Sequence, residues 1–147
     1  MVLREKFPNV QGLIFDMDGV LWKDTTPLFD LGTFFEKLKT LEYKFTFATN
    51  NAIPSLKQVQ DKLKNFGIHA ELEQIITSSL ATVHYLKKRF PEGGPVYVVG
   101  ESGLVETLAN EGFYLAEDHA LAVIAGLDRQ LTYEKIKRAT LLIRKGA

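Results

Sequence analysis

The sequence predicts a layered α/β architecture around a mainly parallel sheet. Short apolar runs alternate with amphipathic segments along the 147 residues, an order that is typical of repeated strand–helix–strand units. The hydrophobic fraction of 46% is high enough for a core of ordinary domain size. We therefore expect one domain with a core of its own rather than two complete domains.

Each element of the first part of the chain follows from its own local pattern. Continuous apolar runs predict strands, whereas apolar residues at spacings of three and four predict helices that face a core. The pattern Ser55-x-x-Gln58 is typical of a capped helix start, and Gly67 marks where that helix ends. The expected elements are strands over residues 12–17 and 44–48 and helices over residues 30–41 and 55–66.

The alternation continues to the end of the chain with one break. Two glycines and two prolines between residues 91 and 95 interrupt the pattern and indicate a domain boundary. We therefore divide the chain into residues 1–91 and residues 92–147. The further expected elements are strands over residues 74–77, 96–99 and 122–125 and helices over residues 79–89, 102–110 and 132–145.

Composition and charge exclude several classes of partner. Eighteen basic residues balance eighteen acidic ones, so no overall field attracts nucleic acid or an anionic membrane surface. The absence of cysteine excludes disulfides and thiolate metal sites and fits a reducing compartment. Apolar stretches are too short to span a membrane, and residues 1–10 do not resemble a signal peptide. We expect a soluble, cytoplasmic protein.

Two carboxylates one residue apart are the first candidate for chemistry. Asp16 and Asp18 lie at the end of the apolar strand over residues 12–17, which we expect to be buried, and Gly19 ends that strand. Two ionised carboxylates about 4–6 Å apart repel by several kcal/mol, so they need a cation, a shared proton or strong hydrogen bonds. A divalent metal meets this need most simply, whereas the alternative is that both residues only bond to turn amides.

The second candidate group follows the next predicted strand. Thr49, Asn50 and Asn51 come directly after residues 44–48, one strand–helix–strand unit downstream of Asp16. Parallel strands joined by a crossover end at the same edge of the sheet, so Thr49 is expected beside Asp16. A hydroxyl, amide side chains and backbone N–H groups at that edge suit a phosphate whose charge a metal balances.

These motifs together resemble the haloacid dehalogenase-like superfamily of phosphohydrolases. The run from Asp16 to Trp22 is similar to the family's first motif, and Thr49-Asn50-Asn51 is similar to its second. More narrowly, the chain resembles NagD-like and 4-nitrophenylphosphatase-like enzymes, in which a large α/β cap follows the third core strand. This resemblance covers nearly the whole chain.

The same resemblance assigns the two parts of the chain. Residues 1–91 would form the N-terminal portion of a Rossmann-like parallel core, which is incomplete here. Residues 92–147 would form part of an α/β cap, and residues 126–135 in particular are similar to that cap.

The resemblance also implies a role for each motif residue. Asp16 would be the nucleophile that accepts the phosphoryl group, and Asp18 would be the acid/base that protonates the leaving alcohol. Asp16, through its side chain, and Asp18, through its backbone carbonyl, would bind Mg²⁺. Thr49 and Asn50 would hold the phosphoryl oxygens, whereas Asn51 is a weaker phosphate ligand that fits a turn-shaping role better. The implied activity is Mg²⁺-dependent hydrolysis of a small phosphomonoester through an aspartyl phosphate.

Two further motifs of the family, a charge-screening lysine and a late acidic strand end, lie downstream of the cap. This sequence stops inside the cap, so we expect little or no turnover from these 147 residues alone. Asp128 and the basic run at residues 87–89 are conceivable substitutes for these motifs. A helix-approach or turn role fits Asp128 better, and a solvated helix end fits the basic run better. Trp22 is expected to pack the flap beyond the aspartates.

Two other functions stay open at this point. The chain would be a non-catalytic module that keeps a phosphate- or Mg²⁺-binding edge, or a phosphotransferase that passes the phosphoryl group to a second alcohol. An incomplete sheet also exposes an unpaired edge, so self-association through that edge or through the cap is expected of the isolated chain.

Overall fold

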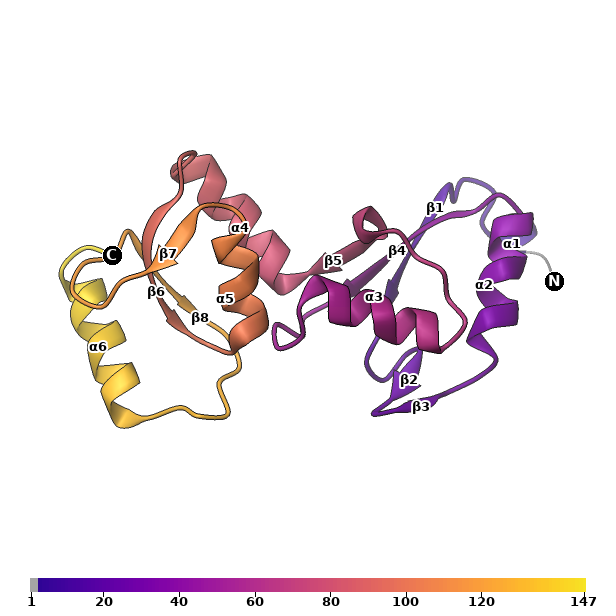
Figure 1. Cartoon of the computed structure of the whole chain (residues 1–147). Helices are drawn as coiled ribbons and strands as arrows, with labels where there is room; N and C mark the ends of the chain where they lie inside the picture. The colour runs from indigo at the N-terminus through magenta and orange to yellow at the C-terminus, as the bar shows by residue number, and fades with distance from the viewer. Residues whose placement is uncertain (1–2) are drawn as a thin grey trace. The chain divides into compact units, whose positions relative to one another are not determined.

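The computed structural model describes residues 3–147, with side chains from Glu5 onward (Figure 1). Contacts divide it into two compact units, Met1–Thr49 with Val59–Ile76, and Asn50–Gln58 with Thr77–Ala147. Both units contain parallel strands joined through helices, which confirms the predicted α/β fold class. The division into core and cap at residue 91 stays a prediction.

The first unit is built on a three-stranded sheet with the order β1-β4-β5. β1 (Gly12–Asp16) and β4 (Lys44–Thr49) run parallel, and the last residue of β1, Asp16, lies opposite Ala48. β5 (Ile75–Thr77) is the other edge strand and follows a 3₁₀ turn at Leu72–Gln74. The carboxyl ends of β1 and β4 therefore meet at one edge, as the crossover argument predicted.

An aromatic cluster joins this sheet to α2 (Leu31–Thr40). The Phe35 ring on α2 lies 5.0 Å from Phe15 and 5.0 Å from Phe47, measured between ring centroids. Phe47 is fully buried, and the edge-on Phe35–Phe15 pair adds to the gain from burial. The cluster holds the β1–β4 pair against the helix that connects the two strands.

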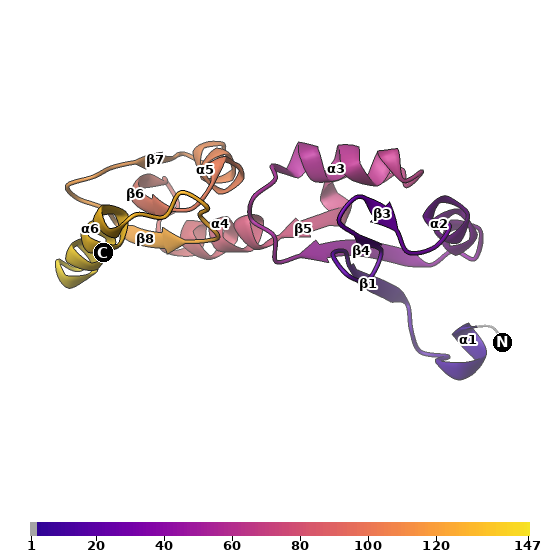
Figure 2. The same ribbon diagram turned by 90° about the horizontal axis from the view of Figure 1, so that it is seen from below.

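The two predicted helix starts in this part of the chain form as expected. Asp30 precedes α2 and its Oδ1 accepts a hydrogen bond from the Thr33 N–H at 3.1 Å. Hydrogen bonding from the Thr33 side chain, and then from this N–H, holds the pKa of Asp30 below its ordinary value. α3 (Leu56–Asn65) starts with the reciprocal capping bonds between Ser55 and Gln58. Figure 2 shows α3 lying along one side of the β4–β5 part of the sheet.

One expectation for β1 is wrong. We predicted a buried strand, but β1 is an edge strand and the Ile14 side chain on its second face is 76% exposed. An apolar run indicates that both faces prefer burial, yet within the described chain only the face with Phe15 is covered. The two aspartates therefore stand at an open edge rather than in a closed interior.

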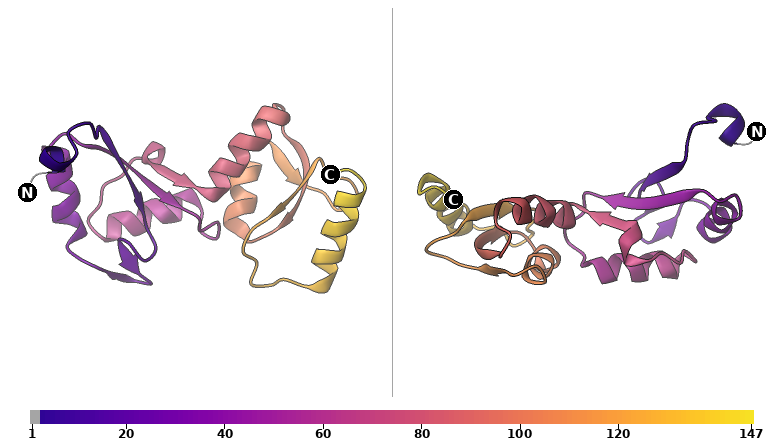
Figure 3. Two further views of the ribbon diagram at one scale, coloured as in Figure 1. Left: turned by 180° about the vertical axis from the view of Figure 1, so that it is seen from behind. Right: turned by 90° about the horizontal axis from the view of Figure 1, so that it is seen from above.

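The second unit holds a parallel sheet with the order β7-β6-β8. Its strands are β6 (Gly94–Val99), β7 (Phe113–Leu115) and β8 (Ala122–Ala125), of which the sequence had not predicted β7. α4 (Ser78–Arg89) and α5 (Ser102–Ala109) pack on the sheet, and α6 (Tyr133–Arg144) contacts β6 and β8 (Figure 3). The buried core consists of Val83, Leu86, Val96, Leu104, Leu108, Phe113 and Ile124.

Two features complete the description of the chain. A short helix, α1 (Leu3–Lys6), precedes β1. Within residues 3–147, no helix combines the length and the apolar character needed to cross a membrane.

Candidate phosphate and metal site

The acidic motif forms a tight turn after β1. Met17 is buried beneath the turn, and its carbonyl accepts the Leu21 N–H at 2.9 Å. Gly19 has a φ of +84°, a left-handed conformation that glycine adopts without strain. Because Met17 points inward, Asp16 and Asp18 on either side of it are both exposed.

Asp16 and Thr49 end neighbouring strands at the same edge. Asp16 is opposite Ala48 in the parallel register, and Thr49 is the next residue of β4. The Asp16 carboxylate makes no hydrogen bond or ion pair within the described part of the chain, whereas Thr49 is only 8% exposed. The edge therefore presents an unpartnered carboxylate and a sheltered threonine on adjacent strand ends, where the sequence placed these two residues.

The Asp18 carboxylate, in contrast, is held by two partners. The Trp22 indole Nε1–H donates to Oδ1 at 2.8 Å, and Lys62 Nζ on α3 lies 3.9 Å from the same oxygen. Lys62 Nζ also sits 4.5 Å from the centre of the Trp22 ring, in cation–π contact. The charge of this aspartate is thus met in part by a protein cation.

Trp22 is fixed in place by the flap that follows the acidic turn. The flap is a short hairpin of β2 (Trp22–Lys23) and β3 (Thr26–Pro27), which the sequence had not predicted. Trp22 is only 2% exposed and its ring lies 5.3 Å from that of Phe66. The expectation that Trp22 packs the flap is confirmed, but its hydrogen bond to Asp18 was not foreseen.

Lys62 was missed for a clear reason. It lies on α3 in a run of polar and charged residues, and helical periodicity only assigns it to a face near Phe66, four residues later. That this face reaches the acidic turn depends on how α3 packs, which local sequence does not state. The only indication in the sequence was Trp22 itself, an aromatic residue four positions after Asp18 that a lysine could contact.

Asn50 and Asn51 follow Thr49 and belong to the second compact unit. The Asn51 Oδ1 accepts the Ile53 N–H at 3.1 Å, a local turn bond. The Asn50 carbonyl accepts a hydrogen bond from the Ser78 hydroxyl at 3.0 Å. These bonds match the turn-shaping role expected of Asn51, and a phosphate-binding role for either asparagine stays a prediction.

The donor chemistry of the edge fits Mg²⁺. Asp16 supplies an unpartnered carboxylate, and the turn supplies backbone carbonyls, which are the hard oxygen donors that Mg²⁺ prefers. Within residues 3–147, no three acidic or histidine side chains gather as a metal cage. Mg²⁺ sites commonly have only one or two carboxylates, with water and substrate phosphate filling the remaining positions.

A polar cleft of about 390 Å³ in the second unit lies at the start of α5. Its charges are paired internally: Glu101 bonds to the backbone and side chain of Arg129, and Lys135 Nζ lies 2.6 Å from Asp128 Oδ2. The Asp128 side chain is 3% exposed, and Lys135 holds the pKa of its carboxyl below the ordinary value. The turn role expected of Asp128 is confirmed by its bond from the Gln130 N–H.

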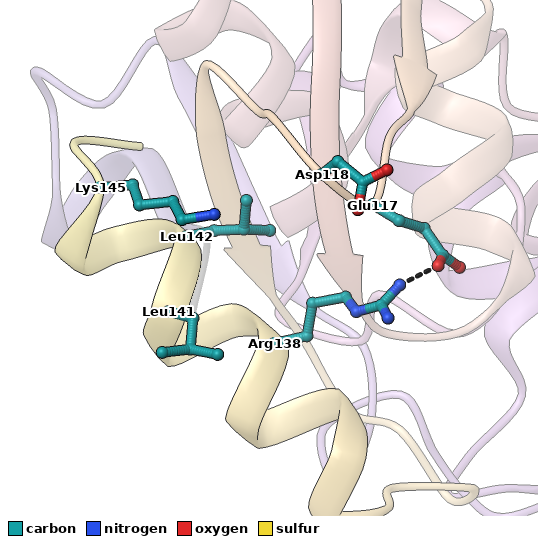
Figure 4. Close-up of a pocket in the computed structure, with 6 residues that line it drawn as sticks. All are labelled: Glu117, Asp118, Arg138, Leu141, Leu142 and Lys145. Carbon is teal, nitrogen blue, oxygen red and sulfur yellow. Dashed lines mark hydrogen bonds and ion pairs between the residues drawn. The ribbon is translucent and has the colours of Figure 1, made fainter.

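A smaller pocket of about 200 Å³ lies beside α6 (Figure 4). Arg138 reaches across it to the Glu117 carboxylate, and Leu141 and Leu142 form its apolar side. Neither this pocket nor the polar cleft contains any of the acidic or Thr-Asn motif residues. The strand edge of the first unit therefore remains the candidate site.

The chain matches the family of haloacid dehalogenase-like hydrolases over residues 13–114, which include both motifs. It belongs to that family. An acid sugar phosphatase of Staphylococcus saprophyticus is 34% identical over 140 residues, which are 95% of this chain and 54% of that protein. The 5′-nucleotidase YutF of Bacillus subtilis is 35% identical over 137 residues, 93% of this chain and 53% of the relative.

The solved structures that resemble this chain include proteins of the NagD-like and 4-nitrophenylphosphatase-like type. The 4-nitrophenylphosphatase of Thermotoga maritima superposes with a TM-score of 0.85 at 31% identity, over 93% of this chain and 52% of that one. The resemblance to NagD-like and 4-nitrophenylphosphatase-like proteins is thereby confirmed. The chain spans about half the length of the curated relatives it matches.

Proposed function

We propose that the protein is a Mg²⁺-dependent phosphomonoester hydrolase that works through an aspartyl phosphate on Asp16. One observation carries this proposal: Asp16 and Thr49 end adjacent parallel strands at one edge, and the Asp16 carboxylate has no partner within the described residues. A carboxylate that bonds to nothing is available to attack. Membership in a hydrolase family supports the same reaction.

The proposed reaction has two steps. In the first, an Asp16 carboxylate oxygen forms a bond to phosphorus while the bond to the alcohol oxygen breaks, and the Asp18 carboxyl gives that oxygen its proton. In the second, a water oxygen forms a bond to phosphorus while the bond between phosphorus and the Asp16 oxygen breaks; the water gives a proton to Asp18, and inorganic phosphate leaves. Asp16 and Asp18 both return to their starting states.

The remaining residues bind rather than react. Thr49 and Asn50 would hold the oxygens of the transferring group, and Asn51 would shape the turn that carries Asn50. Asp16, through its side chain, and Asp18, through its backbone carbonyl, would hold Mg²⁺. When bound, this ion offsets the repulsion between the Asp16 carboxylate and the phosphate dianion.

The substrate class that we propose is a small phosphorylated metabolite. The relatives include an acid sugar phosphatase and a 5′-nucleotidase, which share a phosphomonoester but differ in the alcohol. The two motifs contain residues for the phosphate and the metal, so they support the class and not one member of it. Cytoplasmic location and the absence of nucleic-acid and membrane partners stay predictions.

Hydrolysis of 4-nitrophenyl phosphate tests the proposal. It should be measured with the 147-residue chain and with the product of the whole reading frame that carries it, each with and without Mg²⁺. Asp16→Asn should abolish Mg²⁺-dependent turnover, because an amide is not a competent nucleophile. Asp24→Asn is a matched control, since Asp24 lies in the flap turn with a φ of +54°, a conformation that asparagine also tolerates. Turnover that is unchanged in Asp16→Asn would remove Asp16 from the mechanism.

A non-catalytic module that keeps the phosphate- and Mg²⁺-binding edge is the second candidate, because the chain spans only about half the length of the curated relatives it matches. In that case phosphate and Mg²⁺ would bind to the whole protein in calorimetry, with affinity lost in Asp16→Asn, but no phosphate would be released from any ester. Transfer of labelled phosphate to an added alcohol would instead identify a phosphotransferase.

A further inference from the structure

We propose that Trp22 and Lys62 are positioning residues that hold one oxygen of Asp18 and leave the other to carry the proton. This inference rests on the proposed function, in which Asp18 is the acid/base. Both contacts converge on Oδ1, with Trp22 Nε1 at 2.8 Å and Lys62 Nζ at 3.9 Å. No hydrogen bond to Oδ2 is formed within the part of the chain that the structure describes.

The geometry gives the two carboxylate oxygens of Asp18 different roles: Oδ1 is held by the protein, and Oδ2 is left for the substrate. An acid must present its proton within hydrogen-bond reach of the leaving oxygen, so a freely rotating carboxylate is a poor donor. Here the Trp22 N–H and the Lys62 charge fix Oδ1, which sets the rotation of the whole group. Half of the Asp18 side chain is still exposed (48%), so the second oxygen remains accessible to a substrate.

Trp22 is suited to this task because it is itself immobile. Its ring is buried and packs at an oblique angle against Phe66, and the Trp22 backbone pairs with the Asp18 backbone in an isolated β-bridge. The Trp22 carbonyl also accepts the Gly19 N–H at 2.7 Å, which closes the acidic turn on the tryptophan. The indole N–H therefore has one available direction, and the Asp18 oxygen lies in it.

Lys62 adds a charge that the turn does not contain. It reaches Asp18 from α3 while lying over the Trp22 ring, so the same ammonium group contacts both members of the pair. The ion pair is partly exposed and contributes little to stability by itself. The ion pair acts by orienting the Asp18 carboxylate, an effect that a measurement of stability would not detect.

The leaving group of the substrate gives a readout that a structural role would not move. 4-Nitrophenolate is a stable anion and needs little protonation, whereas an alkoxide needs an acid. With the product of the whole reading frame, we would measure kcat/KM for 4-nitrophenyl phosphate and for an alkyl phosphate. This constant reports only the steps up to and including the first irreversible one, in which the alcohol leaves. Lys62→Met and Trp22→Phe should lower the alkyl value by about tenfold or more and the nitrophenyl value by less than about threefold.

Two variants serve as controls for this comparison. Lys62→Arg keeps the charge and should recover most of the lost alkyl phosphatase activity. Lys64→Met removes an exposed lysine from the same helix and should leave both substrates unchanged. Equal losses for the two substrates in Lys62→Met, or no loss for either, would overturn the inference while leaving the Asp16 test of the proposed function intact.

A second measurement needs neither metal nor substrate. The chain has a single tryptophan, so its indole N–H gives one resonance, which Trp22→Phe identifies by removing it. Asp18→Ala and Lys62→Met should both shift this resonance in the folded 147-residue chain, and Lys64→Met should not. An indole signal that is unaffected by both substitutions would show that the three side chains do not interact in solution, and the inference would fail.

Discussion

Gly103→Ala is predicted to destabilise the second unit, against the usual effect of this substitution in a helix. Gly103 is the second residue of α5, and alanine in a helix is normally more favourable than glycine by up to about 1 kcal/mol. A Cβ on Gly103 would lie 2.3 Å from the Ile53 carbonyl oxygen and 2.6 Å from the Pro54 carbonyl carbon. Both are backbone atoms, so the helix or the loop after Asn51 must move.

The magnitude follows from these two opposed effects. Overpacking of a well-packed site costs about 1–3 kcal/mol, and fixed backbone neighbours place this site at the upper end of that range. After subtraction of the helix-propensity gain, the net loss should be about 1–2 kcal/mol. For a chain of this size that corresponds to a Tm lowered by about 3–8 °C.

Gly32→Ala supplies the matched control. Gly32 is also the second residue of its helix, α2, but a Cβ there would meet its nearest neighbour, the Gly67 carbonyl oxygen, at an ordinary 3.6 Å. This substitution should therefore be neutral or stabilise by up to about 1 kcal/mol. The two variants differ in packing and not in helix position.

Urea unfolding followed by two signals separates the units. Far-ultraviolet circular dichroism reports helices of the whole chain, whereas fluorescence of the single tryptophan, Trp22, reports the first unit. Gly103→Ala should move the dichroism transition to lower urea. If Gly103→Ala proves as stable as the unsubstituted chain, the close approach of Ile53 and Pro54 to α5 is incorrect.

Three further predictions concern stability. Phe47→Ala should cost about 3–5 kcal/mol in urea unfolding followed by tryptophan fluorescence, because Phe47 is fully buried among three other phenylalanine rings; a loss below about 1 kcal/mol would contradict the cluster. Thr77→Ala should cost about 1 kcal/mol by removing the Oγ1 acceptor of the Leu80 N–H at 3.2 Å, and Thr77→Ser should restore most of it. Asp128→Asn should destabilise the chain at pH 7, because Lys135 holds the folded-state pKa of Asp128 below its ordinary value. The contribution of Asp128 to stability is therefore fully present above the unfolded-state pKa of about 4 and is lost as the pH falls through the folded-state pKa. The difference between Asp128→Asn and the unsubstituted chain should narrow below about pH 4 in urea titrations, and a difference independent of pH would exclude the ion pair as its cause.

Much of the fold could be predicted from local pattern because local forces decide it. The capping pair Ser55 and Gln58, and the left-handed Gly67 after α3, act within a few residues of one another and appear where the sequence places them. β7 and the flap hairpin were not predicted, whereas β5, which also has three residues, was; strands this short carry too little periodicity to be distinguished consistently from turns.

The sequence by itself determined the acidic turn, the Thr-Asn group and their meeting at one edge of the sheet. Two parallel strands joined by a crossover must have their carboxyl ends at the same edge. The tertiary structure alone decided which partners Asp18 has. Lys62 reaches Asp18 only through the packing of α3, and the open face at Ile14 follows from which elements cover the sheet. Contacts between residues distant in the chain depend on the sum of many packing interactions, and no local window of sequence contains that sum.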